Sequence, residues 1–375
     1  MIDYVEILDT TKTPIGIIDT AKSIIWHSVY FGCGDFEIYV QATPEYASML
    51  AIGNYVARNG TNDVGIIEKI NVTFNVQDGY MIVASGRFIK SILDRRIIYN
   101  LDDHTNTPTV ISGLVEVAAR QLVTNNAINC TFNTKRNIPN LVLGQLKGFQ
   151  AQIVDKYGNP AQMQVSYQNL LEYTDELLKK YGLAAKITIN ESNKNFLYTV
   201  YTGTDRSSGN TGGYEPIILS VDYDNLNSSD YSFDQTVFKN TVLVGGEGEG
   251  LDRFYSIFDN GSGMRRCEKF LDASSVNRKY KEQGSEEEQE YTVAEYSIML
   301  VQEGVKAAVT KAKEEFNGEI NVSYGTYQFN RDYFLGDIVT IQDNQINKYI
   351  SNRITEATEV QDENGYSVDI VFGEN

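Results

Sequence analysis

Three short stretches within the first hundred residues have the residue pattern of β-strands. They read "DFEIYVQA" (35–42), "KINVTFNV" (69–76) and "GYMIVASG" (79–86), and the last follows a Gln-Asp-Gly turn. Side chains alternate between the two faces of a strand, so the pattern predicts strands with one buried face. The predicted buried residues are Phe36, Ile38 and Val40 in the first stretch, and Ile70, Val72, Phe74 and Val76 in the second. Strands of this kind, joined by short turns, favour an antiparallel barrel or sandwich.

The C-terminal segment 334–373 resembles the N-terminal segment 51–86. The matching anchors are Gly53 with Gly336, Val76–Tyr80 with Val360–Tyr366, and Gly86 with Gly373. Because the anchors keep their order, we predict that one barrel is duplicated within the chain. Two unrelated hairpins can also share Asp-Gly turns and apolar alternation, and this simpler explanation stays open. With two barrels per chain, three chains present six similar barrels and match both sixfold and threefold partners.

Three stretches have the apolar spacing of helices, at 112–126, 166–182 and 292–318. In the second, Ser166 is the predicted N-cap and Gly182 the predicted end. Two strands, "AAKITIN" and "NFLYTVYTG", follow it and complete a small α+β unit. The third helix opens with a Thr292–Glu295 capping box, and its predicted stripe runs as far as Phe316. This length suits a helix that braces one domain against another.

The charge balance argues against a nucleic-acid-binding protein. The 375 residues include 32 Lys and Arg against 50 Asp and Glu, a formal net charge of −18. Stable nucleic-acid binding needs a basic surface to neutralise phosphates, and the basic pairs of this chain are scattered. Neither a signal peptide nor a membrane-spanning helix is predicted, because the N-terminus is acidic and no apolar run is long enough. The cysteines Cys33, Cys130 and Cys267 are odd in number and dispersed, which favours a reducing compartment.

The residues of common catalytic and metal sites are few. The two histidines, His27 and His104, lie in no H-E-x-x-H motif and have no neighbouring ligands at metal spacing. No G-x-S-x-G nucleophile motif is present, and with 50 acidic residues carboxylate pairs arise by chance. The segment "DYDNLNSSDYSF" fails the EF-hand pattern, although Asp222, Asp224 and Asp230 remain candidates for incidental binding of a divalent cation. We therefore predict no catalytic residue, no cofactor and no dedicated metal site.

Residues 243–250 read "LVGGEGEG", a glycine-rich loop after an apolar strand. It matches neither the dinucleotide fingerprint nor the P-loop, and two glutamates occupy the place of a phosphate. The following "LDRFYSIFD" alternates like a strand, so the glycines are expected to allow positive φ and close backbone approach in a reversal. Glu247 and Glu249 are expected to pair with a neighbouring chain or with Arg253. The predicted interface residues are Gly245, Gly246, Glu247, Gly248, Glu249, Gly250 and Arg253.

"NTVLVGGEGEGLDR" (240–253) is similar to the hallmark of a family of tail proteins from long-tailed bacteriophages and prophages. Further stretches of this chain resemble segments of that family and lie in the expected order. They are "VISGLVEVAARQLVTN" (110–125), a middle unit at 147–187, "RFYSIFDNGSGMRRCEKFLDAS" (253–274) and "FLGDIVTI" (334–341). The chain thus resembles the siphophage tail-tip or baseplate-hub structural proteins over nearly its whole length.

The resemblance implies a β-rich α+β fold: a duplicated antiparallel β-barrel with an inserted small α+β domain and a long bracing helix. The expected segments are an N-terminal barrel at 1–108, a helix with the α+β insertion at 109–205, and a β-rich hub region at 206–290 that contains the glycine loop. The bracing helix and the second barrel follow at 291–375, completed with strands from 217–260.

The resemblance also implies a non-enzymatic virion protein at the tail tip: a homotrimeric hub ring that adapts the sixfold tail tube to a threefold tip. Its expected partners are distal-tail or tail-tube proteins, the C-terminus of the tape-measure protein, and tip or receptor-binding proteins. An acidic channel would let DNA pass without binding it stably. Two alternatives stay open. One is a tail-associated peptidoglycan hydrolase or endopeptidase, and the other is a module that binds host-wall carbohydrate.

Overall fold

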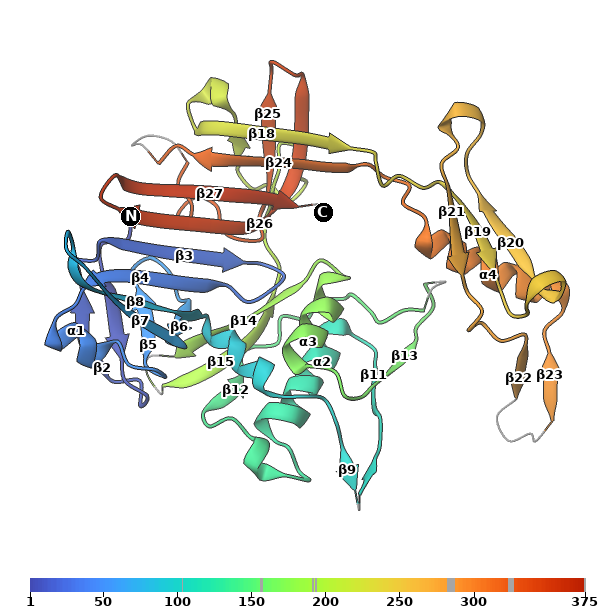
Figure 1. The fold of residues 1–375 in the computed structure, drawn as a ribbon, viewed down its shortest axis with the longest axis horizontal. Helices are drawn as coiled ribbons and strands as arrows, with labels where there is room; N and C mark the ends of the chain where they lie inside the picture. The colour runs from blue at the N-terminus through green and yellow to red at the C-terminus, as the bar shows by residue number, and fades with distance from the viewer. Residues whose placement is uncertain are drawn as a thin grey trace. The chain divides into compact units, whose positions relative to one another are not determined.

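A computed structural model describes residues 1–102, 104–155, 158–190, 192, 194–281, 287–322 and 327–373. The chain forms two compact units, one of residues 1–230 with 316–375 and the other of residues 231–315. The first unit combines the two ends of the chain, which Figure 1 colours blue and red. The fold is of the β-rich α+β class with several antiparallel sheets, as predicted.

A large sheet of eleven strands runs through the first unit. Its strand order is β18-β24-β27-β26-β3-β4-β8-β7, and β25 joins β26, with β16 and β17 paired to β25. The bounds are β3 Ser23–Val29, β4 Asp35–Gln41, β7 Lys69–Asn75, β8 Gly79–Arg87, β16 Asp205–Arg206, β17 Ile218–Leu219, β18 Leu226–Asp234, β24 Lys313–Ile320, β25 Ile338–Asp343, β26 Lys348–Asp362 and β27 Gly365–Gly373. Figure 1 shows β3 beside β26, where N-terminal and C-terminal segments pair antiparallel.

The N-terminal core lies between this sheet and a smaller sheet of order β2-β1-β5-β6. Phe36, Ile38 and Val40 of β4 are buried, as the alternation predicts. They pack with Trp26 in a cluster that includes residues of both sheets. The remaining bounds of this region are β1 Val5–Leu8, β2 Pro14–Ile18, α1 Pro44–Met49, β5 Tyr55–Arg58 and β6 Val64–Ile66.

The prediction of a buried face on β7 is wrong. The strand forms and pairs with β8, but Val72, Phe74 and Val76 are exposed, with 95% of Val76 accessible. Of the four predicted residues, Ile70 alone packs partly against the N-terminal core. β7 stands at the end of the strand order, so the described residues supply no layer over this apolar face. Alternation correctly indicates a strand here, but it does not say which element, if any, covers the strand.

A helical insertion follows β8 and has its own core. The helix α2 (Val115–Val123) contacts α3 (Leu170–Lys179), and α3 contacts β14 (Ala184–Asn190). β14 belongs to a sheet of order β12-β15-β14, with β12 at Leu141–Leu143 and β15 at Asn195–Tyr201. Two further pairings are β9 (Leu101–Asp102) with β10 (Thr105–Asn106), and β11 (Thr109–Ser112) with β13 (Gln162–Val165). Short helical segments complete this region: η1 Ile89–Arg95, η2 Thr124–Ile128 and η3 Thr134–Arg136.

The second predicted helix starts later than its sequence suggests. Asn169, not Ser166, is the N-cap of α3, because its side-chain oxygen accepts hydrogen bonds from the backbone N–H groups of Leu171 and Glu172. Asn169 also donates to Asp94, which ties the cap to η1. Gly182 follows the helix with a φ of +69°, so the predicted end is confirmed.

Two polar contacts join β26 to the N-terminal strands. His27 on β3 lies 3.1 Å from Asp35 and 3.3 Å from Glu356. Burial, the largest single influence, lowers the pKa of His27, but the hydrogen bonds to the two carboxylates outweigh it and leave that pKa above its usual value. Arg58 of β5 forms a buried ion pair with Glu359 of β26.

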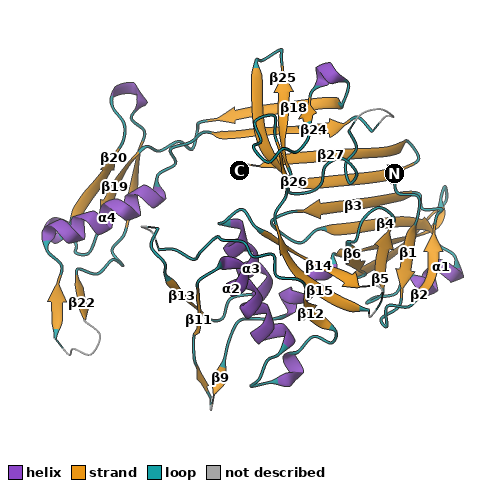
Figure 2. Cartoon of the chain, turned by 180° about the vertical axis from the view of Figure 1, so that it is seen from behind, coloured by secondary structure: helices purple, strands orange, loops and turns teal. Residues whose placement is uncertain are grey.

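The second unit is a three-stranded sheet with a helix on one face. The strand order is β20-β19-β21, with β19 at Thr241–Gly245, β20 at Tyr255–Asp259 and β21 at Glu268–Asp272. The helix α4 (Val293–Ala307) packs Tyr296 and Leu300 against Val242 and Val244 of β19. Figure 2 shows α4 crossing these strands on the near side. The remaining bounds are η4 Val221–Tyr223 (in the first unit), η5 Gly250–Asp252, η6 Gly263–Arg265, β22 Lys279–Lys281 and β23 Glu288–Glu290.

The third helix is shorter than the predicted 292–318. Its Thr292–Glu295 capping box is confirmed, but the helix ends at Ala307. Val309 then exchanges two backbone hydrogen bonds with Lys239, which holds the chain in an extended conformation. Further on, Phe316 lies on β24, where it pairs with Phe372 and is buried. Pairing partners distant in sequence thus override a local helical pattern.

The two segments of the proposed repeat share local geometry. Gly53 and Gly336 both have positive φ, +89° and +92°, and each precedes a strand that pairs with the next one. The later anchors, Gly79 and Gly365, close the β7–β8 and β26–β27 hairpins. The duplication of a whole barrel is not confirmed, because strands of both segments belong to one continuous sheet. It stays a prediction.

Candidate functional site

The glycine-rich loop connects two antiparallel strands, as the sequence predicts. β19 ends at Gly245, β20 begins at Tyr255, and the single turn η5 lies between them. Gly248 has a φ of +107° and Gly250 a φ of +54°. Left-handed backbone at these two positions favours glycine, so two of the glycines serve the turn itself.

The first two glycines serve close packing. A Cβ on Gly245 would lie 2.7 Å from Nε of Arg253. A Cβ on Gly246 would lie 2.6 Å from the hydroxyl oxygen of Tyr296 and 2.8 Å from a methyl carbon of Leu300. All three distances are shorter than real Cβ contacts, so the loop backbone rests directly on α4 and on the arginine.

Arg253 holds the loop from within. Its guanidinium donates to the carbonyl oxygens of Gly246 at 3.2 Å and Gly245 at 3.0 Å. The same group pairs with Asp272 at 2.6 Å. Among the described residues the carboxylate paired with Arg253 is thus Asp272, and the pairing of the loop glutamates with a neighbouring chain stays a prediction. Asp272 lies beside Arg253 because β21 pairs with β19 in a register that sets Asp272 opposite Gly245.

The two glutamates of the loop have different environments. The carboxylate of Glu247 accepts a hydrogen bond of 2.6 Å from the backbone N–H of Arg278. The backbone N–H of Glu247 donates to the hydroxyl of Tyr296, which donates to the carbonyl of Val276. Glu247 thus stabilises its own unit, whereas Glu249 is exposed on the loop surface. Of the two, Glu249 has the side chain available to another chain.

The loop borders an apolar face of the sheet that the sequence reasoning missed. Leu243, Ile257 and Phe270 lie in one row across the three strands and are between 42% and 51% exposed. They face away from α4, which covers the opposite side of the sheet (Figure 1). Tyr255 and Leu251 add exposed apolar surface close to the loop. The available signal was that β19 is apolar at consecutive positions, which indicates apolar residues on both faces.

Charged groups lie on both sides of this row, toward the two ends of the strands. Arg253 pairs with Asp272 at one end, and at the other Arg266 pairs with both Asp259 and Glu268 at 2.6 and 2.5 Å. An apolar centre with a polar rim is the composition of a protein–protein interface.

The sequence offered histidines, aspartates and cysteines as further candidates for a metal-binding or reactive site. Within the described residues no group of three or more His, Cys, Asp or Glu side chains is arranged to hold a metal ion. Asp222 accepts a hydrogen bond from the amide of Asn344. Burial raises the pKa of the Cys33 thiol to about 11, which leaves it protonated and unreactive at neutral pH. In the part of the chain that the structure describes, no helix is long and apolar enough to cross a membrane.

Comparison with solved structures shows a shared fold over the whole chain. The 43 kDa tail protein of prophage MuSo2 from Shewanella oneidensis is similar with a TM-score of 0.57 and 12% identity, covering 99% of this chain and 98% of that one. The tail protein from Neisseria meningitidis MC58 gives a TM-score of 0.55 and 12% identity, with coverage of 99% and 96%. Prophage tail protein gp18 from Listeria monocytogenes EGD-e gives 0.50 and 11%, with coverage of 99% and 95%.

At these identities the likeness concerns the fold. No curated protein matches the sequence. The family described as Siphovirus ReqiPepy6 Gp37-like protein matches residues 4–374. The chain therefore belongs to this family of siphovirus tail proteins.

Proposed function

We propose that this protein is a non-enzymatic structural protein of a phage tail tip, where it forms a homotrimeric baseplate hub. Three copies form a ring that joins the sixfold tail tube to a threefold tip and lines the exit channel. The barrel segments 1–108 and 291–375 build the ring in this proposal, and the insertion 109–205 lies outside it. The observation that carries the proposal is the fold shared with the MuSo2 prophage tail protein over 99% of the chain.

The distribution of exposed apolar residues supports an assembled state. In the first unit, Val72 and Phe74 of β7, Val76 in the turn that follows and Tyr80 of β8 are all more than half exposed. We call these four residues the β7 strip. Phe74 and Tyr80 are cross-strand partners whose rings lie 4.7 Å apart. A strand at a sheet edge with an apolar surface is a ready site for pairing with another chain.

The second unit supplies a second surface of the same kind. The row Leu243, Ile257 and Phe270, with its rim of arginines and carboxylates, is open in the single chain. In the proposed ring the glycine loop presents Glu249 and Leu251 to a neighbour, while Gly245, Gly246, Glu247, Gly248, Gly250 and Arg253 keep the loop in shape. The loop is then a structural element of an interface.

The mass of the protein in solution tests the proposal. We expect native mass spectrometry to show three chains of 42.1 kDa each. Phe74→Asp with Val76→Asp places two carboxylates in the β7 strip and is expected to give a monomer with an unchanged circular dichroism spectrum. Leu146→Asp, at a half-exposed apolar residue in a loop outside both surfaces, is the matched control and should leave the trimer intact.

The position of the protein in the tail and its proposed partners are tested by a second measurement. The proposed partners are distal-tail or tube subunits, the C-terminus of the tape-measure protein, and tip or receptor-binding proteins, with DNA passing through the ring. Electron microscopy of particles with labelled protein should place the label at the tail tip. A stable monomer in solution that is also absent from purified tail tips would overturn the proposal.

A further inference from the structure

A cavity in the first unit collects positive charge in an otherwise acidic protein. Its volume is about 320 Å³, and it is lined by Thr10, Lys12, Tyr55, Ile66, Ile92, Arg95, Arg96, Ile138, Pro139, Asn140 and Phe196. Three of these residues are cations and none is an acid, although the whole chain has a net charge of −18. We call this site the basic cavity.

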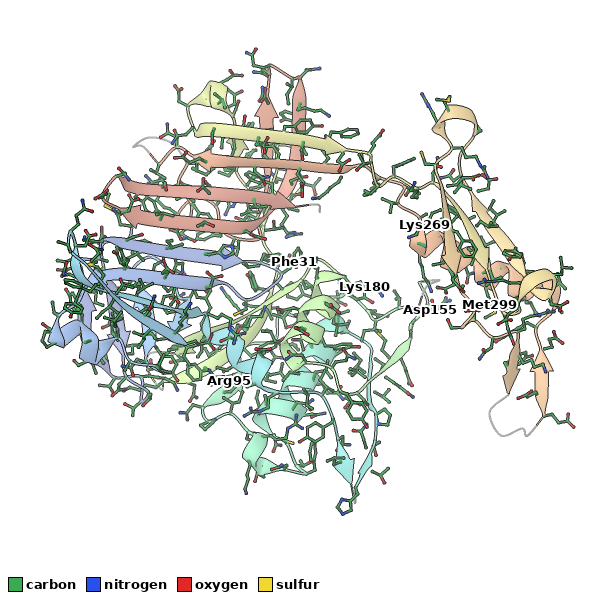
Figure 3. All side chains as sticks on the ribbon, in the orientation of Figure 1. Phe31, Arg95, Asp155, Lys180, Lys269 and Met299 are labelled. Carbon is green, nitrogen blue, oxygen red and sulfur yellow. The ribbon has the colours of Figure 1, made fainter. Side chains whose placement is uncertain are left out.

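The three cations come from two separate parts of the chain. Lys12 lies in the turn between β1 and β2, and Arg95 and Arg96 lie at the end of η1. Figure 3 labels Arg95 at this position. The carboxylate of Glu68 is 3.7 Å from the Arg95 guanidinium, a long contact on a half-exposed side chain. Arg96 donates to the backbone carbonyls of Arg136 and Arg95, so these hydrogen bonds orient it without neutralising its charge.

Lys12 is held inside the protein by its backbone. It has a φ of +63°, and Asp9 stabilises this turn by accepting hydrogen bonds from the backbone N–H groups of Thr11 and Thr13. The Lys12 side chain is directed inward, where the residue is only 7% exposed. Its ammonium donates to the carbonyl of Lys194 and lies 3.9 Å from the centre of the Phe196 ring. A buried ammonium group with these neutral partners favours the approach of an anion.

Burial and neighbouring positive charges act on two of the three cations. Burial and, next, the charge of Lys194 lower the pKa of Lys12. Burial and, next, the charges of Arg136 and Arg95 lower the pKa of Arg96. A lowered pKa means that the folded chain disfavours the charged form of each of these two side chains. A negatively charged ligand would remove this disadvantage, and the folded protein would gain stability on binding it.

The backbone around the cavity is strained at three places. Lys12, Asn140 and Lys194 all have positive φ, between +55° and +63°. They are joined: the Asn140 carbonyl accepts from the N–H of Phe196, and the Lys194 ammonium donates to the hydroxyl of Thr13. Left-handed conformations of residues other than glycine cost about 1 kcal/mol each and collect at ligand-binding sites. The residues with left-handed backbone therefore lie in the same region as the cations of the basic cavity.

Aromatic and apolar side chains also line the cavity. Tyr55 and Phe196 meet edge to face with ring centres 5.7 Å apart, and Ile66, Ile92 and Ile138 are further lining residues. Two arginines and a lysine together match the roughly double charge and the several oxygens of a phosphate monoester better than a single carboxylate. A volume of about 320 Å³ accepts a small molecule, whereas the acidic surface of the chain disfavours a polyanion such as DNA.

We propose that the basic cavity binds a small phosphate monoester whose organic part is apolar. The phosphate lies among Lys12, Arg95 and Arg96, and the apolar part lies against Tyr55 and Phe196. This proposal does not depend on the tail-hub proposal, because it concerns the single chain and its failure would leave the oligomeric state untouched.

Calorimetric titration of the full chain with phenyl phosphate tests the proposal. We expect saturable binding at one site per chain. Inorganic phosphate should bind at least tenfold more weakly, because it lacks the apolar part. Benzoate should also bind more weakly, because it carries one charge, and phenol should not bind. Equal binding of phenyl phosphate and inorganic phosphate, or no saturable binding of phenyl phosphate, would overturn the proposal.

Charge-removing variants locate the site. Lys12→Met and Arg96→Met keep most of the aliphatic stem, and each is expected to weaken binding of phenyl phosphate about tenfold or more. Lys269→Met removes the same charge from an exposed residue of β21, labelled in Figure 3, and should leave binding unchanged. Arg95→Met, at a side chain that is half exposed, is the substitution that best preserves folding and should weaken binding severalfold. Unchanged affinity in the folded Arg95 and Arg96 variants would refute the assignment.

Discussion

The ion pair between Arg58 and Glu359 offers the sharpest test of how the two ends of the chain hold together. The Arg58 side chain is 3% exposed and that of Glu359 is 2% exposed. Glu359 also accepts hydrogen bonds from the Tyr366 hydroxyl and, at 3.2 Å, from the Asn330 amide. Among the described residues, Nε of Arg58 has no hydrogen-bond partner. The arginine thus has one carboxylate partner and, besides it, a long hydrogen bond of 3.4 Å to the Asn59 carbonyl, while the carboxylate has three donors.

Glu359→Gln keeps the shape of the side chain and removes its charge. The guanidinium is then buried without a counter-charge, and breaking a buried pair in this way costs about 3–5 kcal/mol of the free energy of unfolding. Arg58→Met leaves a carboxylate that still has two donors, so we expect a cost near the lower end of that range, about 3 kcal/mol. The double variant has no unpaired charge, and its loss should be smaller than that of either single variant.

Urea unfolding followed by tryptophan fluorescence is the appropriate assay. Trp26 is the only tryptophan of the chain, is fully buried, and has its ring centre 5.4 Å from the Arg58 guanidinium carbon. Its signal therefore reports on the first unit. Lys22→Met breaks an ion pair that is about 40% exposed and should cost less than about 1 kcal/mol, which makes it the matched control. If both single variants lose less than about 1 kcal/mol, or if their losses add in the double variant, the reasoning is refuted.

Gly246→Ala should destabilise the second unit by about 1–3 kcal/mol in thermal unfolding, because its new methyl group meets Tyr296, whereas Gly209→Ala, in open space, should change little. His27→Gln should cost about 0.5–1 kcal/mol at pH 5.5 and almost nothing at pH 8.5. The pKa of His27 is raised in the folded protein, so its ion pairs contribute fully to stability below the pKa of the unfolded state. This contribution is lost as the pH rises through the pKa of the folded state. An equal cost at both pH values would contradict the assigned partners of His27. Asn169→Ala should lose about 1–2 kcal/mol through the cap of α3, and unchanged urea unfolding would show that the cap contributes nothing.

Several features of the fold follow from local pattern alone. The alternation at 35–42 predicted both the strand β4 and its buried residues, because this strand lies between a core and a solvent-exposed side. The Thr292–Glu295 box predicted the start of α4 because capping involves groups only three residues apart. Glycines with positive φ, such as Gly182 and Gly248, were predictable for the same reason. Each depends on interactions within one short segment.

Other features depend on partners distant in sequence. The segment after Ala307 has helical spacing, yet Phe316 becomes part of a strand because it pairs with Phe372. Glu247 and Glu249 were expected to pair with a neighbouring chain or with Arg253, and within the chain the register of β19 with β21 brings Asp272 to Arg253. No pattern within a few residues contains this information.

The sequence by itself determined the class of the protein: a β-rich α+β chain, acidic overall, with a glycine–glutamate loop between two strands and a resemblance to phage tail proteins. These properties rest on periodicity, composition and short motifs, which are local. The tertiary structure alone decided which apolar strand faces stay exposed, and that Lys12, Arg95 and Arg96 line one cavity. The physical reason is that exposure and charge clustering depend on every segment that packs nearby, and strand pairing joins segments more than three hundred residues apart.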